Sequence, residues 1–198
     1  ISDREIICFP FHRAQDELQE VYLGGKKFGS TKRGIGPVYG DKYLKKGIQI
    51  GELLYDPERL KGRLFELVEW KNLTLTKVYG GEPFDKAAML QWLLEYGKVL
   101  KPFIKDSGKI LRNAYKAGKS IMFEAQLGAL RDIDYGIYPY TSSSTPLAAY
   151  APLGCGAPAL KVDQVLGIMK AYSSCVGEGP FVVEMEGEEA ERLREAGG

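Results

Sequence analysis

The richest chemistry in the sequence lies in residues 29–37, which read GSTKRGIGP. A glycine-rich turn lets backbone N–H groups approach an anion, while a hydroxyl and a cation complete the binding shell. The segment therefore predicts an anion-binding loop in which Thr31 supplies the hydroxyl and Lys32 and Arg33 the charge. A mobile surface loop with scattered charge is the alternative, which a short motif alone does not exclude.

A second group of hydrogen-bonding side chains follows much later in the chain. Residues 141–145 read TSSST, and these five consecutive hydroxyls, Thr141 first, suit a phosphate or a ribose. Gln126 stands at the end of an apolar run, where its amide suits the polar edge of a ring. Capping turns use the same hydroxyl residues, and a buried glutamine can be satisfied by backbone, so both interpretations stay open.

The remaining charged residues give weaker indications. Lys45 belongs to a basic segment that could reach a phosphate as a point charge, or could simply be solvated. Asp132 and Asp134 could share one side of a strand as metal ligands, but carboxylates beside a glycine turn more often accept backbone N–H bonds. His12 has no nucleophile at a catalytic spacing and is expected to be structural. We identify no catalytic residue and no metal ligand.

Alternating helix and strand patterns must position these groups. Asp56 and Pro57 predict a helix start, with Leu60, Leu64, Leu67 and Val68 on one face. Residues 24–51 hold eight glycines and predict a loop. Further helices are predicted at residues 13–22, 86–100, 107–117, 162–172 and 188–196, and strands at 5–10, 73–79 (or a hairpin arm), 120–124 and 181–185. The order predicts an α/β fold, a mixed or mostly parallel sheet with flanking helices.

Composition narrows the class of protein. The 198 residues are 44% hydrophobic and 27% charged, which is ordinary globular usage, and a net charge of +1 argues against bulk binding of nucleic acid. Cys8, Cys155 and Cys175 lack disulfide or zinc spacing and fit a reducing cytoplasm. No apolar run is long enough for a membrane span, and no signal peptide is present. The first and last residues are expected to be cuts in a longer chain.

Six motifs together carry a resemblance to one family. Residues 29–37, 123–126 (FEAQ), 132–136 (DIDYG), 138–145, 170–172 (KAY) and 176–181 (VGEGPF), in that order, resemble adenylosuccinate synthetase. The resemblance implies a GTP-dependent, P-loop-like ligase domain that joins IMP and L-aspartate in purine biosynthesis, uses Mg²⁺ and acts as a homodimer. Residues 1–198 would then be the central portion of that single domain.

The resemblance also implies an IMP site at four positions. The family's phosphate-contacting threonines fall on Thr31 and Thr141, and its glutamine on Gln126, one place nearer the preceding glutamate. Lys45 stands where the family has an arginine lent by the partner subunit, and Cys175 where it usually has another arginine.

The family's glycine-rich GDEGKGK segment and its GHT histidine do not occur in this sequence. The acid-base pair and a magnesium ligand of the family belong to those segments, so the chain is expected to be inactive alone. Two alternatives stay open, a related ligase acting on a guanine nucleotide and a non-catalytic nucleotide-binding or oligomerisation module.

Overall fold

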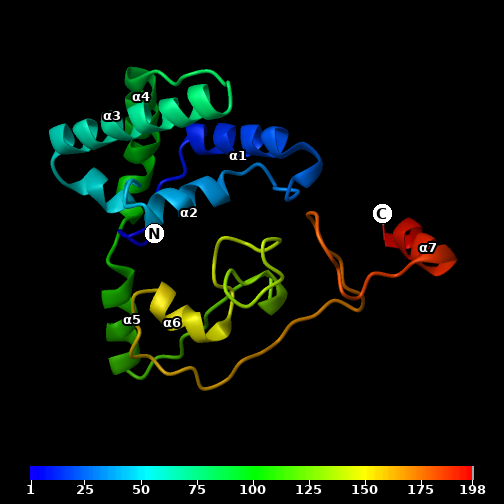
Figure 1. The fold of residues 1–198 in the computed structure, drawn as a ribbon. Coiled ribbons are helices and arrows are strands. Elements are labelled where there is room, and N and C mark those ends of the chain that lie inside the picture. Colours follow the sequence, from blue (N-terminus) through cyan, green and yellow to red (C-terminus); the bar gives the residue numbers. More distant parts are fainter. Residues whose placement is uncertain (198) are drawn as a thin grey trace.

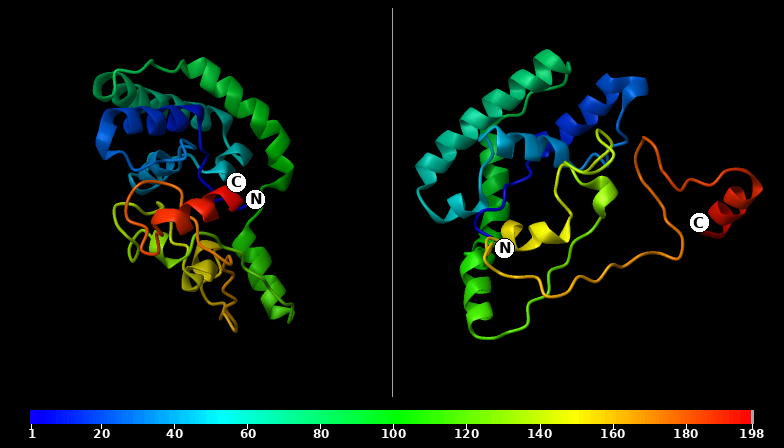
Figure 2. Two further views of the ribbon diagram at one scale, coloured as in Figure 1. Left: turned by 90° about the vertical axis from the view of Figure 1, so that its right-hand side faces the viewer. Right: turned by 60° about the horizontal axis from the view of Figure 1, so that its bottom comes forward.

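The computed structural model describes residues 1–197, which form a helical body with a long irregular carboxyl-terminal part (Figure 1). The helices α1 to α4 pack together, and α5 extends away from them (Figure 2). A long irregular segment follows α6 and ends in α7. None of the helices in this range is long and apolar enough to cross a bilayer. The α-helices are α1 Pro10–Leu23, α2 Ile35–Tyr43, α3 Pro57–Leu73, α4 Lys86–Leu100, α5 Ser107–Lys116, α6 Ala151–Gly154 and α7 Gly187–Gly197. Short 3₁₀ turns occupy Gly24–Lys26, Ile50–Leu54, Lys101–Phe103, Ala129–Arg131 and Ala148–Tyr150.

Aspartate N-caps begin three of the helices. Asp56 accepts a hydrogen bond from Glu58 N at 2.9 Å, Asp85 from Ala88 N at 2.7 Å, and Asp106 from Lys109 N at 2.8 Å. Each bond satisfies one backbone donor of the first turn, which has no partner within the helix. The predicted helices that begin near residues 57, 86 and 107 are therefore confirmed as α3, α4 and α5, and the terminal helix as α7.

The core lies between α3, α4 and the segments that precede α1 and α3. The predicted apolar face of α3 is confirmed, since Leu64 and Val68 are fully buried and Leu60 and Leu67 nearly so. Met89 and Leu93 of α4 pack against this face. Burying each large aliphatic side chain contributes about 1.5–3 kcal/mol, so this cluster is the main source of stability. The other core members are Phe9, Phe11, Ile48, Ile50, Leu53, Leu75 and Ile104.

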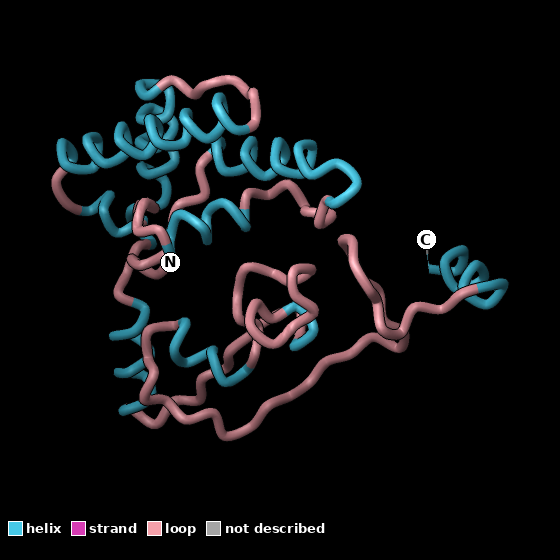
Figure 3. The backbone as a smooth tube through the Cα atoms, in the orientation of Figure 1, coloured by secondary structure: helices cyan, strands magenta, loops and turns pink. Residues whose placement is uncertain are grey.

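The predicted sheet is not found in residues 1–197, where Figure 3 draws helices and loops only. Among residues 1–197, β-type pairing is limited to two isolated bridges, a parallel one between Ser2 and Lys105 and an antiparallel one between Ile6 and Gln49. An extended segment becomes a strand only beside a hydrogen-bonding neighbour. Residues 5–10 and 120–124 lack such a ladder here, so the strands predicted for them are not confirmed.

The strand predicted at residues 73–79 is wrong. The segment continues α3 as a π-helical turn, Thr74–Val78. Alternation of Leu and Thr resembles a strand. The Thr76 hydroxyl, however, donates to the backbone oxygen of Asn72, four residues earlier, at 2.8 Å, a bond that suits a helix end. Leu75 is fully buried in the core, which holds the turn in place. Tertiary packing thus outweighs β propensity.

Two predictions in the carboxyl-terminal part are also wrong. Residues 162–172 are not helical but run extended, with Leu166, Ile168 and Met169 strongly exposed. Without an element against which to bury its apolar face, an amphipathic helix has little to stabilise it. Residues 181–185 form a turn closed by a bond from Glu184 N to Phe181 O at 2.8 Å, not a strand.

The glycine-rich stretch 24–51 contains a helix that the sequence did not predict. Helix α2 tolerates Pro37 because it stands in the first turn, where its missing N–H needs no partner. Val38 and Asp41 of α2 are buried against the rest of the body. These tertiary contacts compensate for the low helix propensity of Gly36 and Gly40.

Candidate functional site

The loop between α1 and α2 is held by two buried carboxylates on α1. Glu20 accepts backbone N–H bonds from Phe28 at 3.1 Å, from Gly29 at 2.9 Å and from Ser30 at 3.0 Å. Asp16 accepts the Ser30 hydroxyl at 2.7 Å and the Gly34 N–H at 2.9 Å. The loop is therefore fixed at residues 28–30 and again at residue 34. Its tip between these points is exposed.

Two glycines make this path possible. Gly29 has a φ of +71°, and a Cβ there would lie 2.6 Å from Glu178 N and 2.7 Å from Gly177 Cα. Gly34 has a φ of +82°, and its Cβ would lie 2.9 Å from Arg13 N. Both positions combine left-handed backbone with contact too close for a side chain, which only glycine accommodates.

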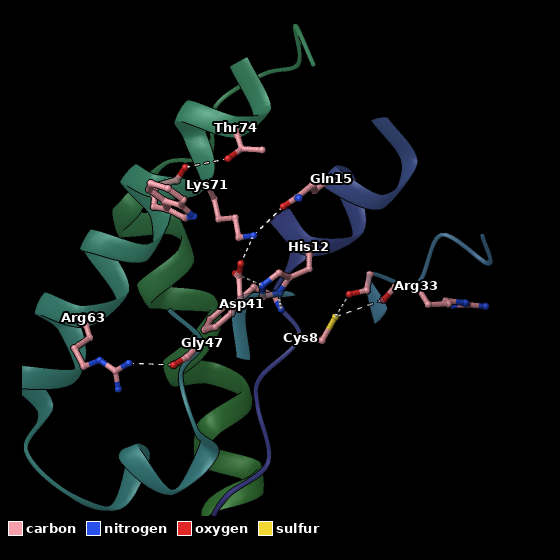
Figure 4. Close-up of polar contacts among 12 residues, drawn as sticks. Cys8, His12, Gln15, Arg33, Asp41, Gly47, Arg63, Lys71 and Thr74 are labelled. Atoms are coloured by element: carbon pink, nitrogen blue, oxygen red, sulfur yellow. Dashed lines mark hydrogen bonds and ion pairs between the residues drawn. The ribbon is translucent and has the colours of Figure 1, made fainter. Parts of the chain in front are cut away.

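Helix α2, which follows the loop, is anchored by a buried polar cluster (Figure 4). His12 Nε2 lies 2.9 Å from Asp41 Oδ2, and Lys71 Nζ lies 2.6 Å from Asp41 Oδ1 and donates to Gln15 Oε1 at 2.8 Å. The Phe9 N–H donates to His12 Nδ1 at 2.9 Å, which leaves the proton of a neutral ring on Nε2, facing Asp41. The cluster joins α1, α2 and α3.

Burial sets the charge states in this cluster. Burial lowers the pKa of His12, and the hydrogen bond with Asp41 opposes that effect only in part. Burial by itself raises the pKa of Asp41, but hydrogen bonds from His12 and Lys71 outweigh it and leave the pKa below its ordinary value. Burial also lowers the pKa of Lys71 against the effect of Asp41. A neutral His12 beside an ionised pair is the arrangement these directions support.

The Cys8 thiol forms a hydrogen bond with the backbone of the loop. It donates to Arg33 O at 3.4 Å, and burial raises its pKa, so it stays a neutral thiol rather than a nucleophile. The prediction that His12 is structural is confirmed by its full burial and by its fixed partners.

Segments of the carboxyl-terminal part meet the loop from the other side. The rings of Phe28 and Tyr140 contact edge to face with centroids 6.1 Å apart, and Glu178 N donates to Phe28 O at 3.0 Å. A Cβ at Gly36, at the start of α2, would lie 3.8 Å from Ser143 Oγ. The glycine-rich loop and the hydroxyl run, more than a hundred residues apart in sequence, are thus neighbours in space.

Arg131 connects two of these segments. Its guanidinium donates to Tyr140 O and Cys175 Sγ, and to Val176 O at 3.4 Å. An open cavity of about 430 Å³ lies beside the loop and is lined by residues of α1, the loop and the 177–178 turn. Its charged lining residues are Glu20, Lys27, Lys32 and Glu178, of which Lys27 and Glu178 form an exposed ion pair at 3.4 Å.

The structure brings two of the four predicted ligand residues into one region. Thr31 is exposed at the loop tip, and Thr141 is half-buried between Tyr140 and Ser143, the residues that approach the loop and α2. Lys45 is exposed just beyond the far end of α2, and Gln126 is exposed in an irregular segment. No hydrogen bond or ion pair within residues 1–197 joins Lys45 or Gln126 to the two threonines.

Sequence reasoning missed Asp16 and Glu20. The available signal was the spacing of His12, Asp16 and Glu20, four residues apart on one face of the helix that enters the glycine-rich loop. All three are buried, which polar residues accept only with partners.

The Asp132 carboxylate confirms the turn interpretation over metal binding. Its Oδ1 accepts N–H bonds from Asp134 and Tyr135, both at 3.0 Å. Within residues 1–197 no group of three or more His, Cys, Asp or Glu side chains could hold a metal ion.

Comparison with known proteins agrees with this geometry. The adenylosuccinate synthetase family model matches residues 1–198. The chain is 45% identical to the adenylosuccinate synthetase of Symbiobacterium thermophilum and 44% identical to that of a Thermoanaerobacter species; each match covers 100% of this chain and 45% and 46% of the relative. It is similar to the fully ligated adenylosuccinate synthetase of Plasmodium falciparum, with a TM-score of 0.88, 32% identity, and coverage of 99% of this chain and 46% of that one. It thus spans just under half the length of these relatives, and it belongs to the adenylosuccinate synthetase family.

Proposed function

We propose that these residues form the IMP-binding part of a GTP-dependent ligase that joins IMP and L-aspartate in purine biosynthesis. The observation that carries the proposal is the approach of the loop at residues 28–36 to the hydroxyl run at residues 140–143. A mononucleotide needs donors from several directions, and two separate segments supply them here. The similarity to adenylosuccinate synthetases supplies the identity of the substrates.

The proposed phosphate contacts are side chains rather than loop amides. The amides of residues 28–30 and 34 already donate to Glu20 and Asp16. Thr31 and Arg33 are exposed between those points, and Thr141 comes from the facing segment. Two neutral hydroxyls and a guanidinium suit a phosphate dianion, because each donates without requiring the loop to open.

Lys45 is proposed to act across a homodimer. It follows the carboxyl-terminal end of α2, whereas Thr31 precedes the amino-terminal end. Nine helical residues span about 14 Å, so one phosphate between Thr31 and Thr141 is out of reach of the same chain's Lys45. An ammonium in this position provides charge without the bidentate geometry of arginine.

The same proposal has consequences for the architecture of the complete domain and for its cellular location. We infer that the residues act as the central portion of a larger α/β domain, in which the extended segments 120–124 and 162–172 gain strand neighbours. Strongly exposed Ile168 and Met169 support this, since soluble proteins rarely leave such runs uncovered. GTP and Mg²⁺ would bind to other parts of that domain. Free thiols at Cys8, Cys155 and Cys175 fit a cytoplasmic location.

The test is the formation of adenylosuccinate by the complete protein supplied with IMP, GTP, Mg²⁺ and L-aspartate. Thr31→Ala and Thr141→Ala should each raise the KM for IMP roughly tenfold or more, because a hydrogen bond to a charged group contributes about 1.5–3 kcal/mol. Thr74→Ala is the matched control, since Thr74 lies at the end of α3 with its hydroxyl turned to Trp70 O. It should leave the KM for IMP unchanged.

Three results would overturn the proposal. The first is no product from IMP. The second is product from GMP in place of IMP, which would identify the ligase as one that acts on a guanine nucleotide. An unchanged KM in both threonine variants would remove these two residues from the site.

A further inference from the structure

We propose that Asp16 and Glu20 are positioning residues for the phosphate-contacting tip of the loop, an inference that rests on the proposed function. Both project from one face of α1, four residues apart, and both are more than nine-tenths buried. Between them they accept five hydrogen bonds from the segment 28–34. Every oxygen of the two carboxylates already accepts a hydrogen bond from this segment, so both residues act through the loop.

The hydrogen bonds to Asp16 and Glu20 hold the loop on both sides of its tip and leave the side chains of residues 31–33 free of these two carboxylates. Glu20 gathers three successive N–H groups, an arrangement that otherwise binds external anions. Asp16 holds the Gly34 N–H just before α2 begins. Residues 31–33 bridge the two fixed points in a short arc, and left-handed backbone at Lys32, with a φ of +55°, turns that arc outward. Thr31 is exposed in this arc, between the contacts that Phe28 and Gly36 make with the segment that carries Thr141.

The consequence for binding is a change in apparent affinity rather than in chemistry. When a ligand binds only one loop conformation, its apparent dissociation constant is the intrinsic one divided by the fraction of molecules in that conformation. The apparent constant therefore rises as that conformation becomes rarer. If loss of a carboxylate leaves the loop correctly placed about a tenth of the time, the KM for IMP rises about tenfold. Saturating IMP restores the loop, so kcat changes little.

The experiment compares Asp16→Ala and Glu20→Gln in the complete protein. Alanine removes both loop bonds of Asp16. The amide of Glu20→Gln cannot accept at both of its ends, so this variant loses at least one of three N–H bonds. We expect the KM for IMP to rise about five- to twentyfold in each. The values of kcat, of the KM for GTP and of the KM for L-aspartate should stay within about twofold. Hydrogen exchange at the amides of residues 28–30 and 34 should accelerate while that of α1 does not.

Asp85→Ala is the matched control. It removes a comparable bond, which a backbone N–H donates to a carboxylate, at the start of α4 rather than at the loop. It should lower the melting temperature without changing the KM for IMP.

The inference is overturned if the KM for IMP changes less than twofold in both loop variants. It is equally overturned if all three KM values rise together, or if Asp85→Ala raises the KM for IMP as much. A wild-type protein that makes no product from IMP overturns the proposed function instead. In that case unchanged exchange at the loop amides would still refute the positioning role, and faster exchange would support it.

Discussion

Residues 1–116 and residues 117–197 differ in how many apolar side chains they bury. The first region contains every member of the main hydrophobic core and also the buried cluster of His12, Asp41 and Lys71. The second buries only a few apolar side chains, and Met122, Leu166 and Ile168 are largely exposed. Helices persist in the first region because they share a core, and extended backbone dominates the second because its segments lack neighbours.

The difference explains where the candidate site lies. The loop at 28–34 belongs to the packed region and is held from α1, whereas the hydroxyl run at 140–143 belongs to the looser region and meets the loop only through surface contacts. A rigid side provides fixed donors, and a side with fewer contacts can adjust to a ligand. The candidate site thus lies where the two regions meet.

Breaking the polar cluster should give the largest effect on the packed region. Lys71→Met leaves the buried Asp41 carboxylate with His12 as its sole remaining partner, and we expect the free energy of unfolding to fall by about 3–5 kcal/mol. Urea denaturation at pH 7.5 measures this. The double variant Lys71→Met/Asp41→Asn removes both charges and should recover part of the loss. If the single variant loses less than about 1 kcal/mol, the pair is not a stabilising element.

A matched pair of leucines sharpens the comparison between the regions. Leu64→Ala in α3 creates a cavity in the core and should cost about 2–5 kcal/mol. Leu166→Ala changes a side chain that is 77% exposed and should stay within about 0.5 kcal/mol in the 198-residue chain. Chemical denaturation of the two variants under one condition gives both values. Equal costs would show that the carboxyl-terminal region buries Leu166 in solution.

A smaller, pH-dependent effect should also belong to the packed region. The pKa of His12 is lowered from about 6.5 on folding, so the unfolded chain binds more protons than the folded chain below that pH. The stability contributed by neutral His12 is complete above pH 6.5 and is lost as the pH falls through its folded pKa. Urea midpoints between pH 7.5 and 5 should therefore decrease, and His12→Gln should flatten the slope. An equal slope in this variant would assign the effect to other groups.

Much of the packed region was predictable from local signals. Asp56, Asp85 and Asp106 mark helix starts because an N-cap acts on the nearest backbone donors, and the apolar face of α3 follows from helical periodicity. The sheet could not be predicted in the same way. Strand patterns in residues 5–10 and 120–124 need hydrogen-bonding partners, and the pattern does not specify which segments these are. The strand predicted at residues 73–79 was wrong for another reason. Burial of Leu75 in the core stabilises a helical turn there despite the alternating sequence.

The candidate site was predictable only in its chemistry. Glycine, hydroxyl and charge in residues 29–37 indicated an anion loop, and the hydroxyls from Thr141 onward indicated a second donor segment. Their proximity, and the use of the loop amides by Asp16 and Glu20, depend on tertiary contacts. Spacing along α1 hinted at these two carboxylates, but only burial distinguishes a buried acidic face from a solvated one.

The sharing of one carboxylate in the polar cluster has a consequence for how mutations act at a distance. Asp41 accepts from His12 on α1 through one oxygen and from Lys71 on α3 through the other, so a single side chain ties α2 to two neighbouring helices. A substitution on α3 can therefore alter the orientation of α2, and with it the loop at its start, without touching any residue near a ligand. If the proposed site binds a nucleotide, its affinity then depends on side chains buried between the helices as well as on those that contact the ligand.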